Sequence, residues 1–217
     1  KTTTVAAMLD HISRTRPDHI ITVEDPVEYL FRPGRGQVTQ REVGRHTQSF
    51  ANALRAALRQ DPDVIMVGEM RDLETTSIAI SAAETGHLVF GTLHTNSAAR
   101  TVARIVDIYP PDQRAQVCTM VSESLRGIIT QQLLPPRDGT GRVAALEILV
   151  FHPGVATAIK EGKTYQLISL MQSGKKMGMK IMDESLMELY QAGLISGRVA
   201  YARAENKVPF EPMKEQD

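Results

Sequence analysis

The amino-acid sequence predicts an α/β fold in which a mostly parallel sheet is flanked by helices and followed by a C-terminal helical part. Two observations lead to this prediction. Helical and strand-like apolar patterns alternate through the first half of the chain, and this order is typical of parallel sheets covered by helices on both faces. The strand-like runs are also short and continuously apolar, as expected of strands buried on both faces.

The first elements are a helix, a strand and a connecting segment. Apolar residues recur at i, i+3, i+4 and i+7 from Val5 onward, which predicts an amphipathic helix. The β-branched run 19–23 predicts a buried strand that ends at the carboxylates of Glu24 and Asp25. We interpret the stretch 31–45, which contains glycine and arginine, as a hairpin or a long loop.

Two further helix–strand pairs follow. Ser49 is a candidate N-cap for a helix that Pro62 prevents from continuing. The apolar run 64–67 predicts the second strand. A helix closed by Gly86 leads to the third strand, over residues 88–93.

After the third strand the pattern becomes mainly helical. One helix is expected over residues 97–108, and a longer one after Pro111 that carries apolar residues as far as Ile129. A fourth strand is expected over residues 142–150, followed by short helices that include 182–190.

Length and composition fit one α/β domain with a smaller helical appendage. We expect a core domain over residues 1–150 and a C-terminal helical subdomain over residues 151–217. The 25 basic side chains balance the 25 acidic ones, so no global basic field favours nucleic acid or anionic lipid.

Cysteine content and hydropathy predict the compartment. Cys118 is the single cysteine, so the chain has no internal disulfide and fits a reducing cytoplasm. No apolar run approaches the roughly 20 residues that span a bilayer. We therefore expect no direct membrane insertion, and membrane association only through a partner.

Polar residues follow all three early strands at the point where each strand ends. They are Glu24 and Asp25, Glu69 and Arg71, and His94 and Thr95. Ligands of open α/β sheets bind outside the carboxyl ends of the strands. We therefore expect these side chains to converge on one crevice.

The opening helix and the second strand carry the clearest chemistry. Free N–H groups and the helix dipole favour an anion beside Lys1, and the hydroxyl of Thr2 is a candidate Mg²⁺ ligand. An ordinary solvated helix start is the alternative interpretation. Glu69 stands where P-loop hydrolases carry the glutamate that polarises the attacking water. Its alternative role is a strand-end carboxylate paired with Arg71.

For two other groups a purely structural role stays open. The acidic residues around Pro26 can form a solvated turn; they are Glu24, Asp25 and Glu28. His87 and His94 can be two satisfied structural histidines.

Several segments resemble the motor ATPases of type IV pili and type II secretion, and the pilus-retraction ATPases most closely. Lys1-Thr2 looks like the end of a Walker A motif. The other motif matches are ITVEDPVEY (21–29) to the Asp box, DPDVIMVGEMRD (61–72) to the Walker B segment and TGHLVFGTLHTNSA (85–98) to the His box. The similarity extends over nearly the whole chain, for example through QREVG at 40–44.

The resemblance implies a RecA-like P-loop core that hydrolyses ATP with Mg²⁺. Lys1 and Thr2 would hold the β/γ-phosphates and the metal, and Glu69 would be the Walker B glutamate. Glu24 would assist with the hydrated metal or the water. The remaining implied nucleotide-site residues are Asp25 and Glu28, the γ-phosphate sensors His87 and His94, and Arg41 and Arg71, which contact phosphate or a neighbouring subunit.

The resemblance also implies a ring. Family members are homohexamers with an N-terminal PAS-like domain, and neighbouring subunits complete the nucleotide site. Their further partners are an inner-membrane pilus platform protein and paralogous ATPases. We expect the PAS-like domain and the glycine-rich part of the phosphate loop to be missing from this chain, which leaves open whether it hydrolyses ATP alone.

Two sequence features bear on the choice within the family. Assembly and secretion ATPases commonly carry a tetracysteine insertion, which a chain with Cys118 alone lacks, so pilus retraction and twitching motility are favoured. The arginine-rich signature of retraction ATPases corresponds here to GVATAIKE, with Ala156 and Lys160 at the arginine positions. A pilus-assembly or type II secretion ATPase and an inactive accessory or scaffold paralogue stay as alternatives.

Overall fold

The computed structural model describes residues 1–215, which form two compact units. The first contains Lys1–His94 and Asp107–Ser124, and the second contains Thr95–Val106 and the chain from Leu125 onward. This division differs from the sequence-based domains 1–150 and 151–217, whose common boundary stays a prediction. Among the described residues, no helix has both the length and the apolar character needed to cross a membrane.

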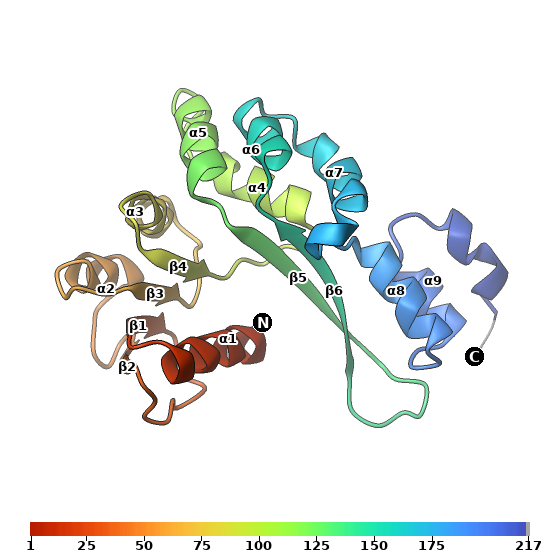
Figure 1. Ribbon diagram of the computed structural model, residues 1–217, viewed down its shortest axis with the longest axis horizontal. Helices are drawn as coiled ribbons and strands as arrows, with labels where there is room; N and C mark the ends of the chain where they lie inside the picture. The colour runs from red at the N-terminus through yellow and green to blue at the C-terminus, as the bar shows by residue number, and fades with distance from the viewer. Residues whose placement is uncertain (216–217) are drawn as a thin grey trace. The chain divides into compact units, whose positions relative to one another are not determined.

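A four-stranded parallel sheet forms the centre of the first unit (Figure 1). Its strands are β1 (His19–Glu24), β2 (Gln37–Glu42), β3 (Val64–Val67) and β4 (Leu88–Gly91), in the order β2-β1-β3-β4. In the register, Val23 of β1 lies beside Val67 of β3, which in turn lies beside Gly91 of β4. The carboxyl ends of these strands therefore lie along one edge, as the sequence predicts.

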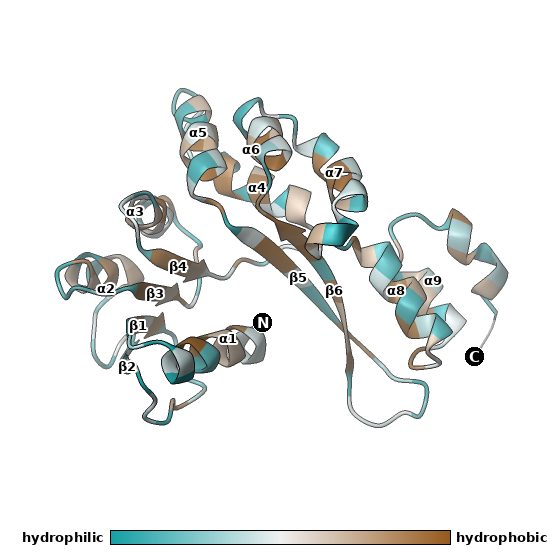
Figure 2. Cartoon of the chain, in the orientation of Figure 1, coloured by the Kyte–Doolittle hydropathy of each residue, from teal (hydrophilic) through white to brown (hydrophobic). Residues whose placement is uncertain are grey.

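One face of this sheet is covered by α1 (Thr2–Thr15). The buried residues that pack together on this face are Leu9, Ile20, Val64 and Met66. β1, β3 and β4 are among the most apolar segments of the chain (Figure 2). Because side chains alternate along a strand, the neighbouring strand residues point to the opposite face.

The opposite face is covered by α2 (Phe50–Ala57) and α3 (Leu73–Glu84). Its buried residues are Val23, Ala53, Leu54, Ile65, Val67, Ala79 and Ala82. α5 (Arg114–Ser124) packs against α3. The predicted parallel sheet with helices on both faces is thus confirmed.

The interpretation of residues 31–45 as a hairpin or a long loop is wrong for its second half. Residues 37–42 form β2, a parallel edge strand beside β1. Gly36 gives the chain room to enter the sheet, because its N–H bonds to the carbonyl of Ser13 at 2.9 Å and any Cβ would lie 2.4 Å from the carbonyl oxygen of Asp18. β2 is only partly buried, so it lacks the apolar run that marks the other strands.

The second unit contains α4 (Ala98–Asp107), except for its last residue, Asp107, which belongs to the first unit. It also contains a hairpin of β5 (Gly127–Leu134) and β6 (Val143–Val150). The strands are antiparallel, with Gly127 opposite Val150. The expected extension of the preceding helix to Ile129 is wrong, because α5 ends at Ser124. Burial alternates along β5, with Ile128 buried and Ile129 exposed, which is the period of a strand.

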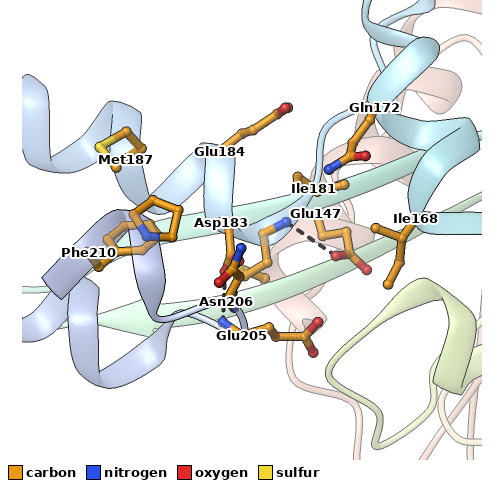
Figure 3. Close-up of a pocket in the computed structure, with 12 residues that line it drawn as sticks. Glu147, Ile168, Gln172, Ile181, Asp183, Glu184, Met187, Glu205, Asn206 and Phe210 are labelled. Carbon is orange, nitrogen blue, oxygen red and sulfur yellow. Dashed lines mark hydrogen bonds between the residues drawn. The ribbon is translucent and has the colours of Figure 1, made fainter.

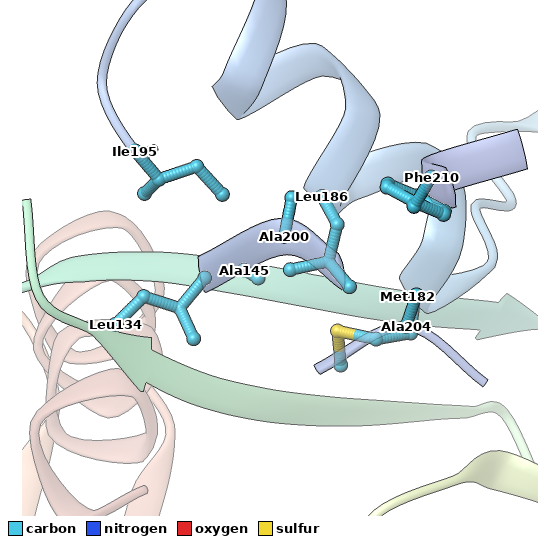
Figure 4. Packing of buried hydrophobic residues seen from close by; sticks show 8 residues of the cluster. All are labelled: Leu134, Ala145, Met182, Leu186, Ile195, Ala200, Ala204 and Phe210. Atoms are coloured by element: carbon cyan, nitrogen blue, oxygen red, sulfur yellow. The ribbon is translucent and has the colours of Figure 1, made fainter. Parts of the chain in front are cut away.

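Short helices follow the hairpin. They are α6 (Pro153–Lys160), α7 (Leu167–Ser173), α8 (Met182–Gln191) and α9 (Gly197–Arg203), with 3₁₀ turns at Thr164–Gln166, Lys175–Met177 and Val208–Met213. The expected helix at 182–190 is confirmed by α8. Figure 4 shows the apolar core that α8 and α9 form with the hairpin; its residues are Leu134, Ala145, Met182, Leu186, Ile195, Ala200, Ala204 and Phe210.

Candidate functional site

The start of α1 lies at the carboxyl edge of the parallel sheet. Lys1 donates a hydrogen bond from Nζ to the carbonyl of Leu93, just after β4. Burial lowers the pKa of the Lys1 ammonium, and the nearby charge of Glu69 opposes this shift. Within the described chain no side chain caps the start of α1, so its positive end is available to an anion.

Glu69 follows β3 and is held by two cationic or potentially cationic groups. Its Oε1 lies 2.8 Å from Nε2 of His94 and pairs with Nε of Arg71. The hydrogen bond from Arg71 is the largest cause of a lowered pKa at Glu69; burial raises this pKa, and the charges of Arg71 and His94 lower it further. Glu69 therefore stays ionised at neutral pH while most of its side chain is shielded from solvent.

The same pairing acts on Arg71. Its hydrogen bond to Glu69 raises the pKa of the guanidinium, and the charges of Glu69 and Asp25 add to the shift. Asp25 is exposed beyond the end of β1. The expected convergence of strand-end residues is therefore seen for Glu69, Arg71 and His94, with Asp25 in electrostatic range of Arg71.

Glu24 is the buried carboxylate at the end of β1. Its Oε1 accepts hydrogen bonds from Thr22 Oγ1 at 2.6 Å and from Gln40 Nε2 at 3.0 Å. The Gln40 amide also donates to the carbonyl of Tyr29 at 2.7 Å. Gln40 thus joins the edge strand β2 to Glu24 and to the segment after β1.

That segment meets the first turn of α1. Thr2 donates from Oγ1 to Oε1 of Glu28 at 3.2 Å, and the hydroxyls of Thr3 and Tyr29 lie 2.9 Å apart. Thr2 and Glu28 offer hard oxygen atoms near the start of α1. Such oxygen atoms are the ligands that Mg²⁺ prefers.

The donor set fits a metal that is bound together with a substrate rather than in a closed protein cage. Among residues 1–215, no three His, Cys, Asp or Glu side chains gather as a metal site. Mg²⁺ commonly uses one or two protein ligands together with substrate phosphates and water. The hydroxyl of Thr2 and the carboxylates of Glu24 and Glu28 suit that mode.

Two residues in the predicted set lie away from this cluster. His87 precedes β4, and its Nδ1 lies 3.0 Å from the carbonyl of Ala82. The guanidinium of Arg41 donates a hydrogen bond to Oε1 of Gln60 at 2.8 Å. Gln60 precedes the start of β3 in the chain. Neither side chain therefore joins Glu69 within this chain, and a nucleotide role for each stays a prediction.

Sequence reasoning missed several supporting groups. Gln40 and Thr22 hold Glu24, and Thr92 donates from Oγ1 to the carbonyl of Gly68, the residue before Glu69. Gln40 opens the QREVG segment at 40–44, which was the one available signal. Nothing in the neighbouring sequence indicates that the polar residues within the strands support the site.

Comparison with known proteins gives consistent matches. A family model described as type II/IV secretion system protein matches residues 1–138. A twitching motility protein of Neisseria gonorrhoeae is 53% identical over 206 residues, or 95% of this chain and 55% of that protein. The type IV pilus retraction ATPase PilT of Pseudomonas aeruginosa is 50% identical over 209 residues, or 96% of this chain and 60% of that protein.

A solved structure gives the same result for the fold. The crystal structure of the pilus retraction motor PilT with bound ADP matches with a TM-score of 0.90 and 52% identity, over 98% of this chain and 60% of that one. This match confirms the predicted RecA-like core. The chain spans less than two thirds of the length of each of these relatives.

Proposed function

Because this chain belongs to the family of type II/IV secretion system proteins, we propose that it is the nucleotide-hydrolysing part of a motor ATPase that powers type IV pilus retraction. Relatives named for pilus retraction or twitching motility match about 95% of the chain. Their similarity continues past residue 138, where the family model ends. Their identities of 53% and 50% support retraction within the wider family.

The contact of Glu69 with His94 is the observation that carries the proposal. A carboxylate after β3 and an imidazole after β4 meet at the sheet edge where the start of α1 also lies. Hydrolysis of a nucleoside triphosphate depends mainly on positioning and electrostatics. This edge provides an anion-binding helix end and an ionised carboxylate together.

Lys1 and the start of α1 bind the β/γ-phosphates in this proposal. The ammonium supplies a positive charge, and the helix end supplies backbone N–H donors. Thr2 and Glu28 would hold Mg²⁺, which would supply positive charge to the phosphate oxygens when bound. The charge of Asp25, which follows β1, acts on Arg71 at the same edge of the sheet.

Glu69 orients and polarises the water that attacks the γ-phosphate. Glu24, held by Thr22 and Gln40, positions the hydrated metal or this water. His94 senses the γ-phosphate while its Nε2 lies beside Oε1 of Glu69. For His87, Arg41 and Arg71, we propose contacts to phosphate or to a neighbouring subunit.

The motor proposal includes assembly and cellular location. A homohexamer would place residues of one subunit beside the nucleotide of the next, which gives exposed arginines such as Arg71 a role at the interface. Its partners would be an inner-membrane pilus platform protein and paralogous ATPases, contacted from the cytoplasm. Zero net charge disfavours nucleic acid as the substrate of the motor.

Two other functions compete with retraction. A pilus-assembly or type II secretion ATPase shares the family but commonly carries the tetracysteine insertion, and Cys118 is the single cysteine here. An inactive accessory or scaffold subunit has no catalytic need for Glu69 to be held ionised beside His94.

Complementation tests the choice of function. The full-length protein that contains this chain is expressed in cells that assemble pili but cannot retract them. We expect restored twitching with the wild-type protein and none with Glu69→Gln at equal protein level. Restoration by both proteins would identify a scaffold role. No restoration of twitching in these cells, together with restored pilus formation in a second strain that lacks its assembly ATPase, would identify an assembly ATPase.

A further inference from the structure

Glu147 is a buried carboxylate on β6, in the second compact unit, that holds the beginnings of two helices. It is 4% exposed. Its Oε1 accepts a hydrogen bond from the backbone N–H of Ala98 at 2.6 Å, and its Oε2 accepts one from Met182 at 3.2 Å. These donors are the first residues of α4 and α8. Figure 3 shows the Glu147 carboxylate beside Ile181, at the start of α8.

Packing alone gives no reason for a carboxylate at this position. Ala145 and Leu149, two residues to either side, are buried and apolar, so Glu147 stands in an apolar row. Burial raises the pKa of Glu147 above its ordinary value, although the hydrogen bonds from Ala98 and Met182 partly oppose this shift. The two positive helix ends offset part of the cost of burying the charge.

The chain itself links Glu147 to the nucleotide site. His94 is the last residue of the first unit before the chain enters the second unit, and Ala98 follows four residues later. Side-chain contacts join the connecting segment 95–97 to α4. The Thr95 and Thr101 hydroxyls lie 2.7 Å apart, and the Ser97 hydroxyl accepts from the N–H of Arg100 at 3.3 Å. Residues 95–97 alone therefore separate His94 from the first turn of α4 along the chain.

We propose that Glu147 is a positioning residue that fixes the first turn of α4 to β6 and α8, and thereby sets the position of His94. Glu147 is far too buried to act on nucleotide itself and works only through the segment 94–98. A change at His94 when the γ-phosphate leaves would reach α8 through the same carboxylate. The inference rests on the proposed function, because it assigns His94 its role at the γ-phosphate.

The test compares two variants of the full-length protein. Glu147→Gln keeps the shape but leaves one acceptor oxygen for two N–H donors. Ser185→Ala is the matched control: Ser185 accepts from the N–H of Leu146 at 3.0 Å and so joins α8 to β6 beside Glu147, without reaching α4. Both variants lose one buried hydrogen bond of this junction.

We expect Glu147→Gln to lower kcat for ATP hydrolysis by about fivefold or more and to leave KM within about twofold, because it disturbs positioning rather than binding. Ser185→Ala should keep both constants near wild type. A wild-type rate in Glu147→Gln would overturn the inference. So would an equal loss of kcat in both variants, which would indicate general destabilisation of the junction.

A second measurement uses the wild-type protein and does not depend on turnover. Hydrogen exchange at the amides of Ala98 and Met182 is compared with ADP and with a non-hydrolysable ATP analogue bound. We expect the protection of both amides to change together with the ligand. Unchanged exchange at both amides would overturn the inference even if Glu147→Gln failed to fold, whereas absent hydrolysis by the wild-type protein would count against the proposed function instead.

Discussion

Nε2 of His94 lies 2.8 Å from Oε1 of Glu69. The two residues are 25 positions apart in the sequence and follow neighbouring parallel strands, β3 and β4. Arg71 pairs with the same carboxylate oxygen. Two side chains thus pair with one oxygen of the carboxylate that is proposed to polarise water, and replacing either of them tests its environment.

Replacing Arg71 by alanine should change how stability depends on pH. Because Arg71 lowers the pKa of Glu69 in the folded protein, the pairing stabilises the fold above the ordinary carboxyl pKa and is lost as pH falls through the lowered one. We expect the free energy of unfolding of wild type to exceed that of Arg71→Ala at pH 7, and the gap to close below about pH 4. Urea unfolding at several pH values measures this gap.

The matched control is Arg55→Ala. Arg55 pairs with Glu74, and both side chains are more than half exposed, so the loss should be at most about 1 kcal/mol. A wild-type advantage over Arg71→Ala that stayed constant from neutral to acid pH would contradict the coupling between Arg71 and the ionised Glu69.

Asp72 caps α3, which begins at Leu73. Its Oδ1 accepts from the N–H of Thr75 at 2.8 Å, and its Oδ2 accepts from the Thr75 hydroxyl at the same distance. Asp72→Ala should lower the free energy of unfolding by about 1 kcal/mol, because an N-cap is lost. Asp72→Asn keeps one acceptor and should retain most of the stability. Equal losses in the two variants, measured by urea unfolding, would argue against capping.

Gly68 is required by close backbone packing just before Glu69. A Cβ at this position would lie 2.9 Å from the carbonyl oxygen of Val23 and 3.3 Å from Cα of Glu24. Gly68→Ala should cost about 1–3 kcal/mol of unfolding free energy, because backbone must move to relieve the contact. Thermal and urea unfolding measure the change.

Gly91→Ala is the control for this close contact. Its Cβ would meet the Met70 side chain, with the sulfur at 2.7 Å, and a flexible thioether can move aside. We expect a smaller loss than for Gly68→Ala. The reverse order of the two losses would mean that the approach of Gly68 to β1 is not tightly constrained.

The sequence was sufficient to predict three of the four strands of the parallel sheet. β1, β3 and β4 are runs of β-branched and apolar residues whose side chains pack on helices at both faces, so hydrophobic periodicity identifies them. β2 was missed because its sequence, QVTQRE, is mostly polar, whereas the other edge strand, β4, is apolar although it is also only partly buried. The start of β5 was missed because Ile128 and Ile129 extend the helical spacing of α5, although only Ile128 is buried.

The site was partly predictable for the same reason. Glu24, Glu69 and His94 stand directly after apolar strands, and parallel strands bring their carboxyl ends to one edge. Gln40, which holds Glu24 from the edge strand, has no such position in the sequence. The roles of His87 and Arg41 rest on motif resemblance and stay predictions; the fold adds that their side chains bond to Ala82 and Gln60 within this chain.

Mg²⁺-dependent ATP hydrolysis by the full-length protein, with wild type and Glu69→Gln compared, tests the central claim most directly. Loss of the carboxylate that polarises water should lower kcat by at least about 100-fold, while ATP binding, measured separately, stays intact because Lys1 and the start of α1 are unchanged. An equal rate of hydrolysis in the two proteins would contradict the assignment of Glu69 and the account built on it.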